Sequence, residues 1–253
     1  MMRTTNVFEL NTMVTIFIDL DNTLILRKKN VSYLSKITDD LHQMQQILNN
    51  YGLPADLLQE LAQINRLAYF WNAVMNYLYS SSLPPTQVIT IRQALHEVIL
   101  KHESLDHEYC YLPEETLPFL TELHTSMYRL ILLTNTSRQE LDKIFQRYPL
   151  ASFFQDSITR DDVVKMKPDA EGVIQLLNRY QENTFIIIDD LDYCVIITQK
   201  AQKAGYQGYA ILVNRGQYHE YDIQKLKPNF VVSTLTEIPP LIHQMYPIRY
   251  KNA

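Results

Sequence analysis

The chain has 253 residues, of which 46% are hydrophobic and 20% charged, and its formal net charge is −5. This composition is typical of a globular protein with a sizeable core and excludes a collagen-like or disordered chain. The acidic balance argues against nucleic acid or an anionic membrane as a partner, and the apolar runs are too short for a membrane-spanning helix.

Glycine and cysteine usage narrows the class of protein further. None of the 5 glycines forms the GxGxxG or GxxxxGK[ST] pattern of nucleotide-binding loops. Cys110 and Cys194 form no CxxC pair, and we expect no secretory signal, so a reducing, cytoplasmic location is predicted. Met13, directly before the first predicted strand, is an alternative start of the chain.

The first predicted element is a buried strand over residues 14–18, which is β-branched, aromatic or apolar at every position. Similar runs follow at 129–133, 184–188, 209–213 and 230–233. Helical patterns alternate with them at 114–126, 138–147, 169–180, 192–204 and 235–245. This alternation predicts an α/β fold with a doubly wound, Rossmann-like parallel sheet.

Residues 27–109 interrupt the alternation, because they contain no convincing strand. Apolar residues there follow spacings of four and three, which predicts one continuous helix face over residues 57–78. A second such face covers residues 88–98. We therefore expect an inserted α-helical cap domain over 27–109 and an α/β catalytic core formed by 1–26 and 110–253.

The strongest functional signal directly follows the first strand, where Asp19 and Asp21 stand in the sequence DLDNT. Ligands of open α/β sheets bind at the carboxyl ends of strands. Two carboxylates at this spacing can converge on one cation, or one can act as nucleophile and the other as acid. The alternative is a polar turn that closes the strand.

Four motifs together resemble the haloacid dehalogenase superfamily, in its branch of helical-cap phosphatases, which includes phosphoglycolate phosphatases, nucleotidases and β-phosphoglucomutases. DLDNT at 19–23 matches the first motif, DxDxT. ILLTN at 131–135, KPD at 167–169 and IIIDD at 186–190 are similar to the second, third and fourth motifs. They occur in the family's order, and the predicted cap lies in the expected gap.

The resemblance implies that Asp19 is the nucleophile, which forms an aspartyl-phosphate, and that Asp21 is the general acid and base. It also implies a Mg²⁺ site made of Asp19, the main-chain carbonyl of Asp21 and one or both of Asp189 and Asp190. The family often has glycine where Asp189 stands, so either aspartate could be the principal ligand. We favour Asp190, because it enters the turn after the strand.

Thr134 and Asn135 are expected to bind the substrate phosphate, next to a helix that starts at the capping box of residues 137–140. Lys167 is expected to place a positive charge beside the nucleophile and the phosphate. Lys165 competes for this role, but the proline that follows Lys167 suits a first helical turn and favours Lys167.

Three further stretches receive structural interpretations. HESLDH at 102–107 has Asp106 where a zinc-binding HExxH helix needs histidine, so a solvated linker between cap and core is expected. The basic run 27–29 is expected to be an exposed loop, although it could attract an anionic substrate. Asp192 is expected to be a helix-start acid that complements the helix dipole.

The predicted function is therefore Mg²⁺-dependent hydrolysis of a small phosphomonoester through a phospho-aspartate. A dehalogenase of the same superfamily would use Asp19 but would not require Asp21. A phosphoglucomutase-like phosphotransferase uses the same four motifs and a similar cap. A non-catalytic binding or regulatory protein on the same fold is the remaining alternative.

Overall fold

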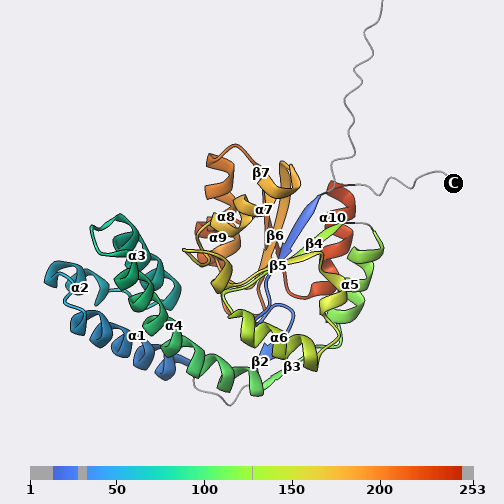
Figure 1. Ribbon diagram of the computed structural model, residues 1–253. Coiled ribbons are helices and arrows are strands. Elements are labelled where there is room, and N and C mark those ends of the chain that lie inside the picture. Colours follow the sequence, from blue (N-terminus) through green and yellow to red (C-terminus); the bar gives the residue numbers. More distant parts are fainter. Residues whose placement is uncertain (1–13, 28–32, 127, 247–253) are drawn as a thin grey trace, which may run out of the picture.

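The computed structural model describes residues 14–27, 33–126 and 128–246, so the alternative start at Met13 lies outside the described residues (Figure 1). Its centre is a six-stranded parallel sheet in the order β5-β4-β1-β6-β7-β8. The strands are β1 (Thr15–Ile18), β4 (Arg129–Leu133), β5 (Asp156–Ile158), β6 (Thr184–Asp189), β7 (Gln207–Val213) and β8 (Phe230–Val232).

Helices cover both faces of this sheet, as the predicted doubly wound fold requires. Successive residues of a strand point to opposite faces, so Ile16 and Ile18 pack on one side and Phe17 on the other. The first side is covered by α5 (Thr116–Thr125), α6 (Arg138–Arg147) and α10 (Ile238–Met245). The second is covered by α7 (Glu171–Tyr180), α8 (Tyr193–Lys203) and α9 (Glu220–Leu226). The predicted α/β core is confirmed.

The predicted helical cap is also present, and Figure 1 shows it to one side of the sheet. It consists of α1 (Tyr33–Asn50), α2 (Ala55–Leu61), α3 (Leu67–Ser80) and α4 (Pro85–Glu108). Trp71 and Met75 are buried in it, as members of a helix core. No helix in the described ranges is long and apolar enough to span a membrane.

The expectation of one continuous helix face over 57–78 is wrong, because the chain leaves the helix between α2 and α3. Arg66 has an extended backbone, with φ −115° and ψ 121°, and serves as the N-cap residue of α3. An apolar period of 3.6 residues persists across such a short break, so the pattern alone does not reveal it.

Two expectations at the ends of the cap also need correction. Leu26–Arg27 forms β2, which pairs in antiparallel fashion with β3 (Cys110–Tyr111), so Arg27 lies in a strand and not in a loop. Lys28 and Lys29, the rest of the basic run, lie outside the described residues. The stretch 102–107 is helical and not an irregular linker, because α4 continues through it to Glu108, directly before β3.

Close packing between β6 and β7 leads to a stability prediction. Gly208 is the partner of Phe185 across these strands, and a Cβ at position 208 would lie 2.1 Å from Phe185 Cζ. Gly208→Ala is therefore expected to lower the free energy of unfolding by about 1–3 kcal/mol, as overpacking typically does. Urea unfolding measures this loss. Adding Phe185→Leu to the variant should restore part of it, and strictly additive losses would contradict the account.

Candidate active site

A cavity of about 520 Å³ lies where the carboxyl ends of β1 and β6 face the cap. The core side of its wall includes Asp19, Asp21, Lys167, Asp189 and Asp190. The cap side is formed by residues of α1, α3 and α4 and by the turn before α3: Ile37, Asp40, Asn65, Arg66, Leu67, Ala68, Ile99 and Glu103. Parallel strands bring their carboxyl ends to one edge of the sheet, which explains why motifs far apart in sequence meet here.

Asp19 is held at the centre of the core side. Its backbone N–H donates to Ile188 O at 2.9 Å, which continues the pairing of β1 with β6. Lys167 Nζ lies 2.5 Å from Asp19 Oδ1 and 2.8 Å from Asp189 Oδ2, and Thr23 Oγ1 donates to Asp19 Oδ2 at 3.1 Å. The structure thus places Lys167 between two of the predicted site carboxylates.

Burial and charge set the protonation of this pair. Burial raises the pKa of Asp19 to about 7, although Lys167 acts in the opposite direction and Asp189 adds to the rise. Burial opposes the charge of Lys167, but Asp189 and Asp19 outweigh it and raise the pKa of its ammonium. Lys167 therefore stays positively charged, while burial makes the charged form of the Asp19 carboxylate less favourable than it is in water.

Asp19, Asp189 and Asp190 form a cluster that can hold a metal ion, with one ligand oxygen from each within 4.8 Å of the others. The Asp189 carboxylate accepts from Lys167 Nζ and, at 2.9 Å, from Leu191 N, whereas that of Asp190 has no hydrogen-bond partner among the described residues. Burial, followed by the charges of Asp189 and Asp19, raises the pKa of Asp190 well above its ordinary value. An all-oxygen set with excess negative charge fits a hard divalent cation such as Mg²⁺.

Asp21 lies at the edge of the cavity, with 22% of its side chain exposed. Thr136 Oγ1 donates to Asp21 Oδ2 at 2.8 Å, and Arg27 Nη2 lies 3.6 Å from Oδ1. A tight turn sets this position: Asn22 has a φ of 60°, and its N–H donates to Ile25 O at 2.7 Å. Asparagine tolerates this left-handed conformation better than most residues.

The two predicted phosphate-binding residues after β4 occupy different places. Thr134 is 2% exposed, its hydroxyl accepts from Thr136 N at 3.0 Å, and it is not among the described residues that line the cavity. Asn135 does line the cavity. Its amide holds the backbone of Lys167 from both sides, because Nδ2 donates to Lys167 O at 3.0 Å and Oδ1 accepts from Lys167 N at 2.8 Å.

Residues 13–191, more than half of the chain, match the family model described as haloacid dehalogenase-like hydrolase. The chain belongs to this family. The predicted membership of a hydrolase family is thereby confirmed.

Individual relatives of this hydrolase are distant. A phosphoglycolate phosphatase from Vibrio cholerae is 26% identical over 151 residues, which are 58% of the chain and 65% of that relative. The pyrophosphatase PpaX of Bacillus mycoides is 24% identical over 240 residues, which are 91% of the chain and 97% of that relative.

Solved structures share the fold. A protein described as a predicted phosphatase from Clostridium acetobutylicum aligns with a TM-score of 0.58 at 15% identity, over 92% of this chain and 99% of its own. A haloacid dehalogenase phosphatase from Thermococcus onnurineus aligns with a TM-score of 0.52 at 17% identity, over 91% of this chain and 98% of its own. These alignments, which extend over nearly the whole chain, show that this hydrolase shares the overall fold of these proteins.

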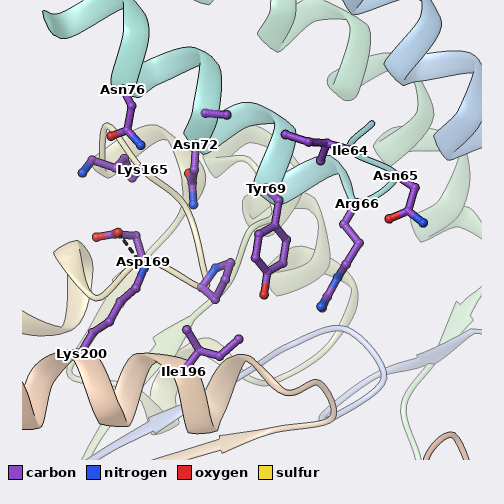
Figure 2. A pocket seen from close by; sticks show the side chains of 12 residues that line it. Ile64, Asn65, Arg66, Tyr69, Asn72, Asn76, Lys165, Asp169, Ile196 and Lys200 are labelled. Carbon is purple, nitrogen blue, oxygen red and sulfur yellow. Dashed lines mark hydrogen bonds and ion pairs between the residues drawn. The ribbon is translucent and has the colours of Figure 1, made fainter. Parts of the chain in front are cut away.

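The hydrolase has a second groove, of about 600 Å³, between α3 of the cap and α8 of the core (Figure 2). Lys165 lines this groove, at the end opposite Arg66 in the view, and does not line the cavity that holds Asp19. The argument from a first helical turn is wrong, because Pro168 lies in a turn and α7 begins only at Glu171. Geometry, not the proline, sets Lys167 apart from Lys165.

Arg66 and Asn65 line both the groove and the cavity, so they form the wall between them. Arg66 Nη2 and Nη1 donate to the Asp192 carboxylate at 2.7 and 3.0 Å, a bidentate contact between cap and core. The guanidinium also lies 4.7 and 4.8 Å from the ring centres of Tyr69 and Tyr193. Asp192 is the N-cap residue of α8, so it lies at a helix start as expected. Its side chain makes no hydrogen bond to the first turn of α8 and instead binds Arg66 of the cap domain.

Proposed function

We propose that this hydrolase is a Mg²⁺-dependent phosphatase that cleaves a small phosphomonoester through an acyl phosphate formed on the Asp19 carboxylate. One observation carries the proposal. The buried Asp19 carboxylate faces a cavity of about 520 Å³, is 2.5 Å from the Lys167 ammonium and shares a cation-binding cluster with two further carboxylates. A carboxylate in this setting can attack phosphorus, and the intermediate splits one difficult step into two.

Each side chain has a separate part in the proposed reaction. Lys167 orients Asp19 and offsets the charge of the phosphoryl oxygens. An Asp19 oxygen bonds to phosphorus while the bond from phosphorus to the leaving oxygen breaks, and Asp21 gives that oxygen a proton. Asp21 then removes a proton from the water that attacks the phosphorus, which releases phosphate and restores Asp19.

The residues proposed to hold Mg²⁺ are Asp19, Asp190, Asp189 and, through its main-chain carbonyl, Asp21. When bound, the cation reduces the repulsion between an anionic nucleophile and an anionic substrate. Asp190 is the favoured principal ligand, because Lys167 and Leu191 N already occupy the Asp189 carboxylate. The cluster of Asp19, Asp189 and Asp190 contains no Cys or His, the side chains that zinc sites in proteins mostly use.

The substrate is proposed to be a small phosphorylated metabolite, since a cavity of about 520 Å³ suits a molecule of that class. The relatives named phosphoglycolate phosphatase and pyrophosphatase suggest that phosphoglycolate and pyrophosphate be assayed first, beside sugar phosphates and nucleoside monophosphates. Release of phosphate, and not formation of an isomer, separates this proposal from a phosphotransferase.

The metal requirement is the test of this proposal. EDTA is expected to stop phosphate release from an aryl phosphate, and added Mg²⁺ to restore it. Asp190→Asn should raise the Mg²⁺ concentration needed for half-maximal activity, because the cluster loses one ligand charge. Asp192→Asn is the matched control, since Asp192 is bound to Arg66 and lies outside the cluster. Full activity in excess chelator would contradict the proposal.

A further inference from the structure

Helix α4 of the cap presents a polar stripe to the core segment that follows β5. Arg92, His96 and Glu103 are spaced four and seven residues apart, which places them on one face of the helix. Arg92 Nη2 donates to Val163 O at 2.8 Å, and His96 Nδ1 lies 3.3 Å from Asp161 Oδ1. Arg92 and His96 thus both contact the core, and Glu103 is the third residue of the same stripe.

Glu103 binds a buried arginine of the core. Arg160 is only 2% exposed, and its Nη1 and Nη2 lie 2.9 and 3.0 Å from the two carboxylate oxygens of Glu103. Nη1 also donates to Asn135 O at 2.8 Å, while Nε has no partner in the described part of the chain. Since a buried guanidinium is costly without its partners, Glu103 fixes where Arg160 lies.

The same carboxylate reaches the loop after β4 directly, because Ser137 N donates to Glu103 Oε1 at 3.2 Å. Residues 134–137 are thus held from the cap at two points: Asn135 O through Arg160, and Ser137 N. A displacement of Glu103 would break the contact with Ser137 N and would remove the carboxylate that holds the Arg160 guanidinium beside Asn135 O.

This loop in turn holds two groups of the proposed reaction. The Asn135 amide binds the Lys167 backbone through both of its polar atoms, and Thr136 Oγ1 binds the Asp21 carboxylate. Lys167 is the residue that contacts Asp19. A continuous series of hydrogen bonds therefore runs from α4 of the cap to the ammonium and the acid of the site.

We propose that Glu103 is a positioning residue: through Arg160 and residues 134–137 it aligns Lys167 and Asp21, so that the catalytic geometry is complete only when α4 is docked on the core. The inference rests on the proposed function for its effect on rate. The contacts themselves predict a structural effect that does not depend on that function.

The kinetic test is Glu103→Gln. Misplacement of reacting groups by about 1 Å costs up to ~10²-fold, so we expect kcat to fall by about 10- to 100-fold. KM should change by less than about 3-fold, because the two Glu103 carboxylate oxygens are already bound by Arg160 and Ser137 N and act on groups used in the chemical steps. Arg92→Gln is the control, because it removes a contact of the same stripe that does not lead to Asn135, and its kcat should match that of the unmodified enzyme.

A double variant separates positioning from simple loss of a charge. If Glu103 acts mainly through Arg160, then Glu103→Gln added to Arg160→Gln should lower kcat by clearly less than the product of the two single losses, since only the contact with Ser137 N remains to be lost. Glu103→Asp, which keeps the charge on a shorter side chain, should lose less than Glu103→Gln and serves as the second variant if the glutamine protein does not fold. Independent, multiplying losses would overturn the inference.

Amide hydrogen exchange tests the inference in a way that does not depend on catalytic turnover. In Glu103→Gln, the amides of Thr136, Ser137 and Lys167 should exchange faster, while in Arg92→Gln they should exchange as in the unmodified chain. Unchanged exchange at these amides, or a kcat for Glu103→Gln equal to that of Arg92→Gln, would overturn it. If the unmodified protein releases no phosphate from any substrate, the proposed function fails, and exchange alone decides the inference.

Discussion

Replacing Asp19 with asparagine is expected to lower the rate of phosphate release by at least ~10⁴-fold, the scale seen when a nucleophile is removed. An amide cannot form the mixed anhydride with phosphate, so neither step of the proposed reaction can proceed. The measurement is kcat for an aryl phosphate at saturating Mg²⁺.

The fold of the Asp19→Asn variant should survive, which allows the loss to be assigned to chemistry. Burial raises the pKa of Asp19 to about 7, above its ordinary value, so the charged form costs folding stability as the pH rises through that value. Asparagine removes this cost, and Lys167 keeps Asp189 as a partner at 2.8 Å. The melting temperature should therefore not fall. Substantial turnover by a fresh preparation would contradict the assignment; freshness matters, because deamidation regenerates aspartate.

Asp21→Asn is expected to slow turnover of an alkyl phosphate by ~10²–10⁴-fold, the usual contribution of general acid–base catalysis. Thr136 Oγ1 can still donate to the new side-chain oxygen, so the local structure should persist. Mg²⁺ and phosphate analogues should still bind, since only the main-chain carbonyl of Asp21 is proposed to contact the cation.

The size of this loss should depend on the leaving group. An aryl phosphate needs less protonation to depart, so its first step should suffer less than that of an alkyl phosphate. The loss should not vanish, because Asp21 also activates the water in the second step. Wild-type rates with an alkyl phosphate, or abolished Mg²⁺ binding, would show that the roles of Asp19 and Asp21 are divided differently.

The core of the fold could be predicted because its signals are local and periodic. Strands buried on both faces, such as β6, are apolar at successive positions, and the helices between them repeat every 3.6 residues. Short elements carry too little of either pattern: β5 has 3 residues at the edge of the sheet, and α9 has 7. Neither is predicted, whereas β8, also 3 residues at an edge of the sheet, lies in the apolar, β-branched run at 230–233 and is predicted.

The grouping of Asp19, Lys167, Asp189 and Asp190 could be predicted from topology, because each follows or faces the carboxyl end of a parallel strand. Their catalytic roles stay predictions. The contacts of Asn135 with the Lys167 backbone could not be derived, since an Asn after a strand predicts a loop or a cap equally well.

Contacts between cap and core were not predictable from the sequence. Arg66 and Asp192 are 126 residues apart, and Glu103 and Arg160 are 57 apart. Each is a charged residue in a polar stretch, and a single charge has no periodicity that reveals a distant partner.

The most direct test of the account is to trap the intermediate. The enzyme is mixed with an aryl phosphate and Mg²⁺, quenched in acid within one turnover, digested, and examined by peptide mass spectrometry. The account predicts one phosphoryl group on Asp19, with a larger trapped fraction in Asp21→Asn if the second step is the slower one. Phosphate on a different residue, or rapid turnover with an unmodified Asp19 peptide at every quench time, would contradict it.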